Sequence, residues 1–467
     1  MNYTASYVRN SSADFVDLLV IPNPFEDYVN SGTVIESTST GREAYCFHGD
    51  LYYDEEDYVC EECHCYMNRH DTYHVRLRHV CMGEKLTYVM VDKHRFMCPQ
   101  CGHYKMQQIP FQADGHHITN ELLTQVESML SNGFTNKQIS GLTGLHQATI
   151  KDIDKARLKR LYTEDGVTLK KPEKQARYLA IDEFKLHDGY QFATHIIDLE
   201  SGHVLWIQKG KKKQVVYDFI QFVGDDWMSK VEAVACDMNS DFQEAFEEKC
   251  PDIQIVYDHF HLIKNFNEKV VTEVRKDEQN RLIREGKTQA AQSLKGSRYI
   301  LMSKRETLQK KDTDARERKI TQCAVPLFGV PEQRQLGENE HRYNRLLAEN
   351  KLFCAIDIEK ELLHDAFDAS SDAEMADKMD YIMDVCNGTE NSHFKWFARL
   401  ILNHYEGIIA HGSIRISSGK IEGINNKIKV QRRQAYGYND DEYFFLKILD
   451  ASRRCYERTL SSPKLLH

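Results

Sequence analysis

The sequence predicts an α/β domain that is interrupted by a long helical segment and preceded by two small N-terminal modules. Three patterns support this architecture. Strand-like and helix-like segments alternate between residues 177 and 260, residues 286–410 read as almost entirely helical, and two CxxC pairs lie within the first 101 residues. The 467 residues suffice for about two to four domains with a substantial core.

The net charge of −10 is distributed unevenly along the chain. Residues 1–62 contain 13 acidic and 2 basic side chains, so the rest of the chain is close to neutral. Residues 133–177 carry 10 Lys and Arg against 5 acids, and residues 415–435 carry 6 against 1. Such basic patches favour contact with phosphates. The acidic residues 1–45 read as weakly structured, as a solvated tail, an interaction arm or a mask over basic surfaces.

No apolar run reaches the length of a membrane span, and the N-terminus lacks the basic-then-apolar pattern of a signal peptide. We therefore expect an intracellular protein without a membrane partner. The 13 cysteines are numerous for such a chain, and several are clustered. In a reducing compartment, clustered cysteines indicate metal binding rather than disulfides.

Residues 46–112 are predicted to form a zinc-binding domain. Cys60 and Cys63 make one CxxC pair and Cys98 and Cys101 make a second, with 34 residues between the pairs. Each pair brings two thiolates to one ion, and two pairs complete a tetrahedral site without an open position. We therefore expect one structural Zn²⁺. Cys65 is close enough in sequence to replace Cys63 in a shifted pair.

A helix-turn-helix domain is predicted for residues 113–165. Thr135 would cap its first helix, Ile139 and Leu142 would face the core, and Gly144 would lie in the turn. The alternative is a small helical domain with a solvated basic face.

The second helix of this domain would run from His146 to Arg160 as the recognition helix. Its first residues would then reach base edges or phosphates of double-stranded DNA. The predicted DNA contacts in this domain are Lys137, His146, Gln147, Thr149 and Lys151.

Residues 175–285 read as three strands followed by a helix, a strand, a helix and a strand. The first three strand patterns are RYLAIDEF, YQFATHIIDLE and HVLWIQKG. Helical patterns at 213–222 and 241–248 flank the strand VEAVACDM, and IQIVYDHF follows. This order is that of the ribonuclease-H-like fold. The predicted fold class is thus an α/β ribonuclease-H-like catalytic domain, built from 175–285 and 411–456, with 286–410 as a helical insertion.

Two acids occupy apolar strands of this predicted sheet. Asp182 lies inside YLAIDEF and Asp237 ends VEAVACDM, where an acid is costly unless it is paired or bound to metal. The first and fourth strands of this fold are neighbours, so the two carboxylates would converge. A third acid, Glu422 or Asp258, would complete a site for two Mg²⁺ or Mn²⁺ ions, which support in-line phosphoryl transfer. The alternative for each acid is a strand-end cap or a salt bridge.

Glu422 is the one acid in a segment otherwise rich in bases and amides, SSGKIEGINNKIKVQRRQAYG. In a helix, Asn425, Asn426 and Lys429 would share its face, which suits a site for a metal ion and a phosphodiester together. The alternative is a solvated basic helix with one charge pair. Glu422 ranks above Asp258 as the third ligand, and Asn425 is open between substrate contact and helix packing. Arg432 and Arg433 are predicted to follow phosphates.

Two histidines follow Asp258 in YDHFHLIKN. His259 or His261 would act as an accessory group that positions a phosphate or the attacking water. The alternative is a hydrogen-bonded junction between a strand and a helix.

These segments together resemble the DDE transposases of bacterial insertion sequences, specifically the ISL-three family. The resemblance covers roughly residues 60–455, and its last segment is the most specific. It rests on the cysteine pairs, on the helix-turn-helix with TGLH, and on AIDEF, CDMNSDF, IVYDHFHLIKNFNEKVVTEVRK, LKGSRYILMSKRETL and SSGKIEGINNKIKVQRRQAYG.

The resemblance implies that Asp182, Asp237 and Glu422 form a catalytic triad. It also implies cleavage at the ends of the element and joining of the 3′ hydroxyls to target DNA. Some DDE families carry a Tyr-Arg-Glu-Lys signature around the glutamate. Here Arg415 and Ser418 stand at the tyrosine and arginine spacings, so only the Glu-Lys half carries over, with Lys429 near the cleaved bond.

The expected partners are the terminal inverted repeats and target DNA, bound by a homodimer in a synaptic complex. The expected location is the bacterial cytoplasm, at the nucleoid when DNA is bound. One alternative is a catalytically silent or domesticated DNA-binding regulator, and another is a structure-selective nuclease on the same fold. The intact triad favours an active transposase over the first, and the helix-turn-helix argues against the second.

Overall fold

The computed structural model describes residues 5–7, 20–22, 28–37, 43–189, 191–238, 240–257, 259–321, 338–416, 419–435 and 437–454. The chain divides into two compact units. Unit 1 consists of Met1–Lys170 and Gly437–His467, and unit 2 consists of Lys171–Tyr436.

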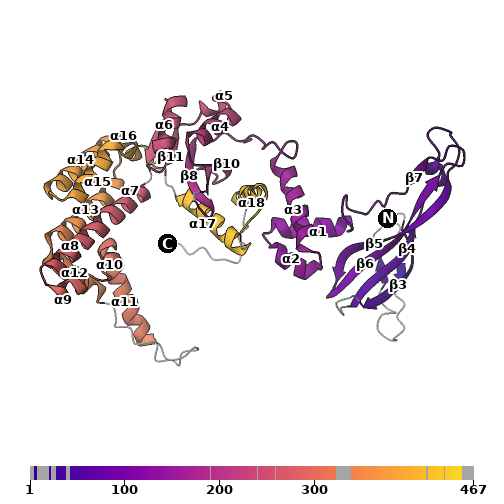
Figure 1. Cartoon of the computed structure of the whole chain (residues 1–467), viewed down its shortest axis with the longest axis horizontal. Coiled ribbons are helices and arrows are strands. Elements are labelled where there is room, and N and C mark those ends of the chain that lie inside the picture. The colour runs from indigo at the N-terminus through magenta and orange to yellow at the C-terminus, as the bar shows by residue number, and fades with distance from the viewer. Residues whose placement is uncertain are drawn as a thin grey trace. The chain divides into compact units, whose positions relative to one another are not determined.

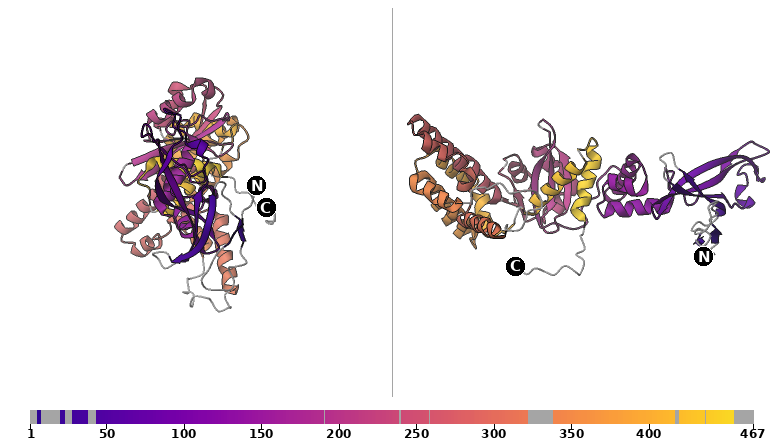
Figure 2. Two further views of the ribbon diagram at one scale, coloured as in Figure 1. Left: turned by 90° about the vertical axis from the view of Figure 1, so that its right-hand side faces the viewer. Right: turned by 90° about the horizontal axis from the view of Figure 1, so that it is seen from below.

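Unit 1 begins with a mixed sheet of order β3-β4-β6-β5, in which β7 also pairs with β6 (Figure 1). β5 and β6 form a long antiparallel hairpin, an elongated ribbon in Figure 2, while β4 runs parallel to β6. Leu77, Val89 and Phe111 are buried at its centre. The bounds are β1 (Ala5–Tyr7), β2 (Val20–Pro22), β3 (Tyr28–Ser37), β4 (Glu43–Leu51), the 3-10 helix η1 (Glu55–Tyr58), β5 (Asn68–Met82), β6 (Lys85–Met97) and β7 (Tyr104–Met106).

Strand β3 lies in a segment for which the sequence predicted little structure. The run Asn30-Ser31-Gly32 breaks its apolar alternation, and the strand register shifts there. Strand formation here depends on the neighbour more than on the segment itself. β3 pairs along its length with β4, whose Ala44 and Cys46 are fully buried.

Helices α1 (Asn120–Ser131), α2 (Asn136–Thr143) and α3 (Gln147–Tyr162) follow the sheet. Thr135 and Gln138 form a capping box at the start of α2, and Gly144 ends it with a φ of 70°.

The buried face of α2 differs in part from the prediction. Ile139 is buried as expected, but Leu142 is 55% exposed. The buried residue one turn after Ile139 is Thr143 instead, because the i, i+4 spacing keeps Thr143 on the same helix face.

The last helix among the described residues, α18 (Asp441–Arg453), packs against α3 within unit 1. Asp154 of α3 is fully buried and accepts hydrogen bonds from Tyr443 Oη (2.7 Å), Lys447 Nζ (2.8 Å) and Arg157 Nη2 (2.8 Å). Arg157 also pairs with Asp450 at 3.3 Å. The charges buried between α3 and α18 therefore satisfy one another.

Unit 2 contains a five-stranded sheet of order β10-β9-β8-β11-β12. β8 and β9 are antiparallel, whereas β8, β11 and β12 run parallel to one another. This mixed sheet and its order fit a ribonuclease-H-like domain. The elements are β8 (Tyr178–His187), β9 (Gln191–Asp198), β10 (Val204–Lys209), α4 (Lys213–Val223), α5 (Asp225–Met228), β11 (Ala233–Cys236), α6 (Ser240–Lys249) and β12 (Gln254–Tyr257).

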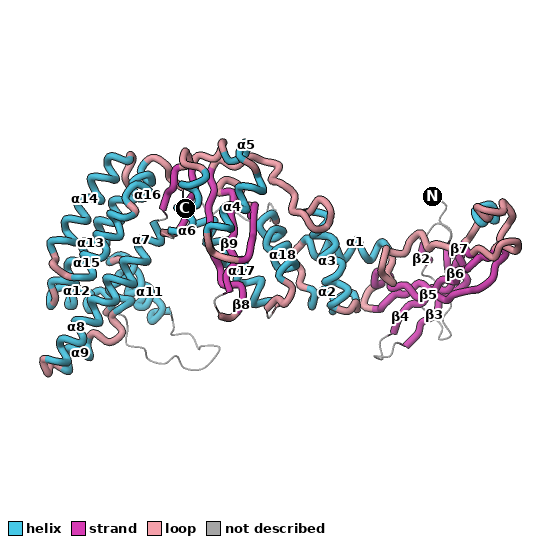
Figure 3. Tube along the Cα trace, turned by 45° about the horizontal axis from the view of Figure 1, so that its top comes forward, coloured by secondary structure: helices cyan, strands magenta, loops and turns pink. Residues whose placement is uncertain are grey.

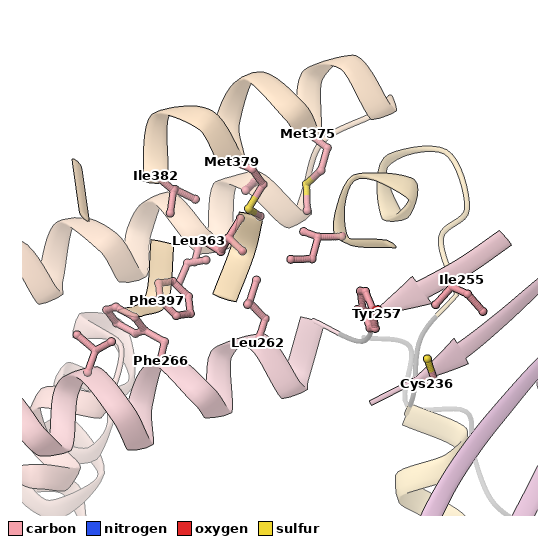
Figure 4. Packing of buried hydrophobic residues seen from close by; sticks show 14 of the residues in the cluster. Cys236, Ile255, Tyr257, Leu262, Phe266, Leu363, Met375, Met379, Ile382 and Phe397 are labelled. Atoms are coloured by element: carbon pink, nitrogen blue, oxygen red, sulfur yellow. The ribbon is translucent and has the colours of Figure 1, made fainter. Parts of the chain in front are cut away.

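The chain after β12 is helical up to Gly412 in the described residues, and Figure 3 shows this segment without strands. It packs on the sheet through one continuous core. Figure 4 shows Leu262 and Phe266 directed toward Leu363 and Phe397 of the insertion, and the rings of Phe266 and Phe397 are 5.0 Å apart. The bounds are α7 (His259–Asn265), the π-helix η2 (Phe266–Val271), α8 (Thr272–Arg284), α9 (Thr288–Ser293), α10 (Arg298–Met302), α11 (Arg305–Thr321), α12 (Asn339–Glu349), α13 (Lys351–Phe367), α14 (Asp372–Gly388), α15 (Ser392–Asn403), α16 (Tyr405–Ile409) and the 3-10 helix η3 (Ala410–Gly412).

Helix α17 (Gly419–Gln434) then returns to the sheet and packs against β8. Lys420 donates to the carbonyls of Leu199 and Glu200 at one end, and Arg432 donates to the carbonyl of Lys185 at the other. Among the described residues, no helix is both long enough and apolar enough to span a membrane.

Candidate functional site

A cavity of about 440 Å³ lies where β8, the end of β11, α7 and α17 meet in unit 2. We call it the candidate active-site cavity. Carboxylates and basic side chains share its wall. The lining residues are Asp182, Glu183, Phe184, Lys185, Asp237, His261, Lys264, Asn425, Ile428, Lys429 and Arg432.

Asp182 and Asp237 lie at the same level of two neighbouring parallel strands. Ala180 of β8 is in register with Ala235 of β11, and each aspartate follows its alanine by two residues. The fold thus brings together two carboxylates that are 55 positions apart in sequence.

Asp182 is half-buried and accepts two hydrogen bonds. The backbone N–H of Glu183 donates at 2.8 Å and Asn425 Nδ2 donates at 2.6 Å. Burial nevertheless raises the pKa of Asp182, and the negative charge of Asp237 adds to that rise. A positive charge between the two carboxylates would oppose both effects.

The donor set of this cavity fits a hard divalent cation. Two carboxylates supply oxygen ligands of the kind that Mg²⁺ and Mn²⁺ prefer. A bound cation would also favour the ionised form of Asp182 and so counteract the burial that raises the pKa of Asp182.

His261 lies beside Asp237, with 3.7 Å between Nε2 and the nearer carboxylate oxygen. His259, two residues earlier on α7, lies outside the lining of this cavity and contacts the rings of Phe367 and His411. The structure thus separates two histidines that the sequence analysis treated as alternatives. Asp258 lies outside the described residues.

Helix α17 turns a mixed face toward the cavity. Ile421, Ile424 and Ile428 are buried against the sheet. The side chains of α17 that line the cavity at the border of this apolar face are Asn425, Lys429 and Arg432.

Glu422, predicted as the third ligand, is exposed and is absent from the described lining of the cavity. It lies one helical turn before Asn425. Arg433 is exposed as well, one position beyond Arg432.

His195 of β9 faces Asp182 across the strand pair and is completely buried. Burial lowers the pKa of His195 to about 4, so its ring is uncharged at neutral pH. His195 therefore packs beside Asp182 without placing a charge next to the cavity.

In unit 1, the Sγ atoms of Cys60, Cys63, Cys98 and Cys101 lie within 4.8 Å of one another. Two loops of the same construction hold them. Cys60 N–H donates to the carbonyl two residues after Cys63, and Cys98 N–H donates to the carbonyl two residues after Cys101. The residue after the second cysteine of each loop has a positive φ, 53° at His64 and 72° at Gly102. Four thiols on two matched loops form a cluster that could hold zinc.

Hydrogen bonds from the backbone lower the pKa of the Cys98 thiol. The backbone N–H groups of Cys101 and Gln100 donate to its Sγ and lower the pKa of Cys98 to about 6. Cys65 also approaches, at 3.4 Å from Cys98 Sγ, but it holds the loop position that His103 holds in the other loop. The matched geometry therefore favours Cys63 over Cys65 as the ligand from the first loop.

Among the DNA-binding candidates of α2 and α3, Lys137, His146 and Gln147 are exposed and Thr149 is half-buried. Lys151 instead pairs with Asp440, at 3.1 Å. The same stripe of α3 continues with Lys155, which pairs with Asp440 and Glu442, and with Lys159, which pairs with Glu442.

Sequence reasoning missed these acidic partners of α3. Partial burial raises the pKa of Asp440, yet hydrogen bonds from Tyr443 N–H, Lys155 and Lys151 bring it down to about 2. The sequence shows Asp440 and Glu442 as two acids, but it does not show that they contact α3, because Lys155 and Asp440 are 285 positions apart.

Lys264, which lines the candidate active-site cavity, was also missed. In the sequence it is only a basic residue in a predicted helix.

Comparison with known proteins bears on the whole site. A family model described as Transposase, of the ISL3 type of DDE transposases, matches residues 179–448. The chain is 27% identical to the transposase for insertion sequence element IS1001 of Bordetella parapertussis over 84% of this chain and 87% of the relative. It is 23% identical to the transposase for insertion sequence element IS1557 of Mycobacterium tuberculosis over 57% of this chain and 58% of that relative.

Proposed function

The chain belongs to the ISL-three family of transposases, and from this premise we propose that it cleaves DNA at the ends of its insertion sequence and joins those ends to target DNA. The active site would be the cavity around Asp182 and Asp237. The observation that carries the proposal is the pair of carboxylates at one level of neighbouring strands, in a cavity that basic side chains also line.

Asp182, Asp237 and a third acid would hold two Mg²⁺ or Mn²⁺ ions. When bound, such ions supply Lewis-acid activation of the attacking oxygen and stabilise charge on the leaving oxygen. Asn425 holds the carboxylate of Asp182 in one orientation through its 2.6 Å hydrogen bond. Glu422 is the first candidate for the third acid because it lies on α17 one turn from Asn425, and Asp258 is the second.

The basic residues of the cavity would position the DNA backbone. Lys264 and Lys429 are exposed at its wall, and Arg432 is fixed by its bond to the carbonyl of Lys185. Basic side chains beside Asp182 and Asp237 suit a phosphodiester brought against a metal site. His261, next to Asp237, is placed to orient a water or a phosphate oxygen.

Recognition of the terminal inverted repeats would fall to unit 1. Its zinc cluster would stiffen the sheet with one structural Zn²⁺, and the exposed residues Lys137, His146 and Gln147 would reach the DNA. Two chains would act together as a homodimer on the paired ends and the target DNA.

Asp237→Asn tests the proposal in the full chain. We expect unchanged affinity for inverted-repeat DNA and a loss of strand cleavage with Mg²⁺ of at least about a thousandfold, because the carboxylate acts on the reacting groups. Gel-resolved cleavage of end-labelled DNA and fluorescence anisotropy measure the two quantities. The exposed Asp252 supplies the control, since Asp252→Asn should change neither.

Wild-type cleavage by Asp237→Asn would remove this aspartate from the mechanism. Specific binding without cleavage by the wild-type chain would indicate a regulator instead.

Glu422→Gln and Asp258→Asn together identify the third acid. We expect Glu422→Gln to abolish cleavage and Asp258→Asn to retain it. The reverse result would assign the third position to Asp258.

A further inference from the structure

A second cavity, of about 300 Å³, lies between α7–η2 and the helical insertion, and we call it the insertion cavity. Its wall combines apolar side chains and aromatic rings with an amide, two lysines and an aspartate. The lining includes His259, Phe266, Asn267, Lys304, Phe367 and His411.

Helix α7 forms a wall of both cavities. His261 and Lys264 line the candidate active-site cavity, whereas His259 and Ile263 line the insertion cavity. A helix with its side chains is about 10–12 Å across, roughly the rise of three stacked nucleotides at about 3.4 Å each. A DNA strand whose phosphate occupies one cavity can therefore place a nearby nucleotide at the other.

Three aromatic side chains of the insertion cavity lie close together. Phe367 lies 5.4 Å from the ring of His259 and 5.3 Å from the ring of His411, measured between centroids, and is inclined to them by 54° and 82°. The three rings therefore do not form one flat wall. A single aromatic face such as that of Phe367 suffices to stack an unstacked nucleobase, with little preference among the four bases.

Asn267 provides an acceptor that nothing in the described structure uses. Its Oδ1 is buried and has no hydrogen-bond partner among the described residues. A buried acceptor without a partner is destabilising, and a ligand that carries an N–H would satisfy it. The exocyclic amino group of a nucleobase is such a donor.

The backbone at Asn267 is also irregular. Phe266–Val271 is π-helical, and Thr272 N–H donates to the carbonyl of Asn267 rather than to the next one along. Such π-helical turns are frequent at functional sites. Phe266 anchors this one in the core.

A cation for a phosphate is present at the rim. Lys304 is exposed there, whereas the three donors of Lys360 are already taken by the carbonyls of Leu301 and Ser303 and by Tyr343 Oη. Lys360 thus stabilises the wall, and Lys304 is left to meet a ligand.

We propose that the insertion cavity binds one unpaired nucleobase of the DNA strand that is being processed. The base stacks on Phe367, donates to Asn267 Oδ1 and carries a phosphate toward Lys304. This inference rests on the proposed function, because it requires DNA in the neighbouring cavity. Holding one base out of the duplex would fix the strand on both sides of α7.

The test uses the full chain with Asp237→Asn, which prevents cleavage, and an inverted-repeat duplex with a three-nucleotide single-stranded 3′ end containing 2-aminopurine. We expect the fluorescence of one 2-aminopurine position to change on binding. Asn267→Leu, Phe367→Ala and Lys304→Ala should each weaken binding of this DNA about tenfold, which is about 1.4 kcal/mol. Binding of the fully paired duplex should stay unchanged.

The exposed Lys310 and Asn280 supply the controls Lys310→Ala and Asn280→Leu, which should behave as the parent. Lys304→Ala alters an exposed side chain, so its effect cannot come from loss of folding. Unchanged affinity in all three cavity variants, or equal loss on paired DNA, would overturn the inference.

Two further comparisons distinguish a wrong ligand from a wrong site, and the failure of this inference from the failure of the proposed function. If the 5′-monophosphate of 2-aminopurine riboside binds as tightly as the single-stranded end, the ligand is a free nucleotide and the inference is wrong. If the wild-type chain cleaves the DNA while the cavity variants behave as the parent, the proposed function stands and only the base site fails.

Discussion

Asn425 shows how one amide can decide the state of a carboxylate. It is half-buried at the cavity wall, and its Nδ2 bonds Asp182. Without that bond the carboxylate would rely on the Glu183 backbone N–H alone. The next residue, Asn426, is exposed, so the two asparagines form a matched pair.

We predict that Asn425→Ala slows single-turnover DNA cleavage by about 10- to 100-fold, because a hydrogen bond to a charged group contributes roughly 1.5–3 kcal/mol. Asn426→Ala should cleave at the wild-type rate. Binding of Mn²⁺, followed by calorimetry, should weaken in Asn425→Ala only. Equal cleavage rates for the two variants would indicate that Asn425 contributes only to helix packing.

Glu359 makes the stability of the insertion depend on pH. It is completely buried, and Cys386 Sγ at 3.3 Å is its described partner. Burial raises the pKa of Glu359 from 4.5 to about 7. Between these values the folded chain keeps a proton that the unfolded chain has released, so the free energy of unfolding falls as pH rises from about 4.5 to 7, by at most roughly 3 kcal/mol.

We therefore predict that Glu359→Gln removes this fall. The variant should exceed the wild type by about 1–3 kcal/mol at pH 8 and match it near pH 5, because the amide stays neutral at both. Urea unfolding at a series of pH values measures the difference. Glu361→Gln, at an exposed neighbour, should follow the wild-type curve, and a Glu359→Gln curve with the same slope would contradict the argument.

At the scale of elements, the two cysteine loops are equivalent in backbone structure. Both close with the same hydrogen bonds and the same positive φ after the second cysteine. This equivalence separates Cys63 from Cys65, which distance alone does not, because Cys65 also touches Cys98.

We predict about one Zn²⁺ per native chain, retained in Cys65→Ser and lost or bound far more weakly in Cys63→Ser. Elemental analysis and competition with a chromophoric chelator measure the content and the affinity. If zinc is lost from Cys65→Ser but kept in Cys63→Ser, the ligand from the first loop is Cys65 and not Cys63. If the native protein contains no zinc, the prediction of a zinc site is wrong.

The strands of unit 2 could be predicted because each carries its own signal. AIDEF and AVACDM are apolar runs with acids near their ends, and β8, β11 and helix α4 between them lie where the patterns predict them. Strand β3 could not be predicted, because its alternation breaks at Gly32 and its stability comes from β4. The prediction that Leu142 faces the core was wrong because residues three and four positions after Ile139 can both lie on its helix face. Packing alone decides that Thr143 is buried and Leu142 is exposed.

For the candidate site, local sequence pointed to Asp182 and Asp237 but not to the contacts around them. The bond from Asn425 to Asp182 spans 243 positions, and no pattern within a helix or strand encodes it. The split of His259 and His261 between two cavities depends on how α7 is rotated against the insertion. The assignment of catalytic roles stays a prediction.

At the scale of the whole molecule, unit 1 is assembled from both ends of the sequence. Asp154 and Arg157 of α3 pair with each other, and Tyr443, Lys447 and Asp450 of α18 supply their remaining partners. Because a buried charge without partners is strongly destabilising, α18 is part of the structure of unit 1 and not an appendage.

We predict that Asp154→Ala destabilises unit 1 by about 3 kcal/mol, since Lys447 then stays buried without its partner. Calorimetry of the full chain measures this in the transition that zinc chelation also shifts. Lys155→Met, which breaks a more exposed pair, should cost less than about 1 kcal/mol. Equal effects of the two changes would show that burial of the network is unimportant.

The packing of α18 against α3 also determines when unit 1 can be completed during translation. Arg157 and Asp450 are 293 positions apart, so at roughly 5–20 residues per second a ribosome delivers the second about 15–60 s after the first. Throughout that interval Asp154 and Arg157 of α3 have each other but lack their partners from α18. A message broken anywhere before codon 441 yields chains that never complete this unit. Only translation through α17 and beyond produces it, so a finished unit 1 comes with a finished unit 2 on the same chain.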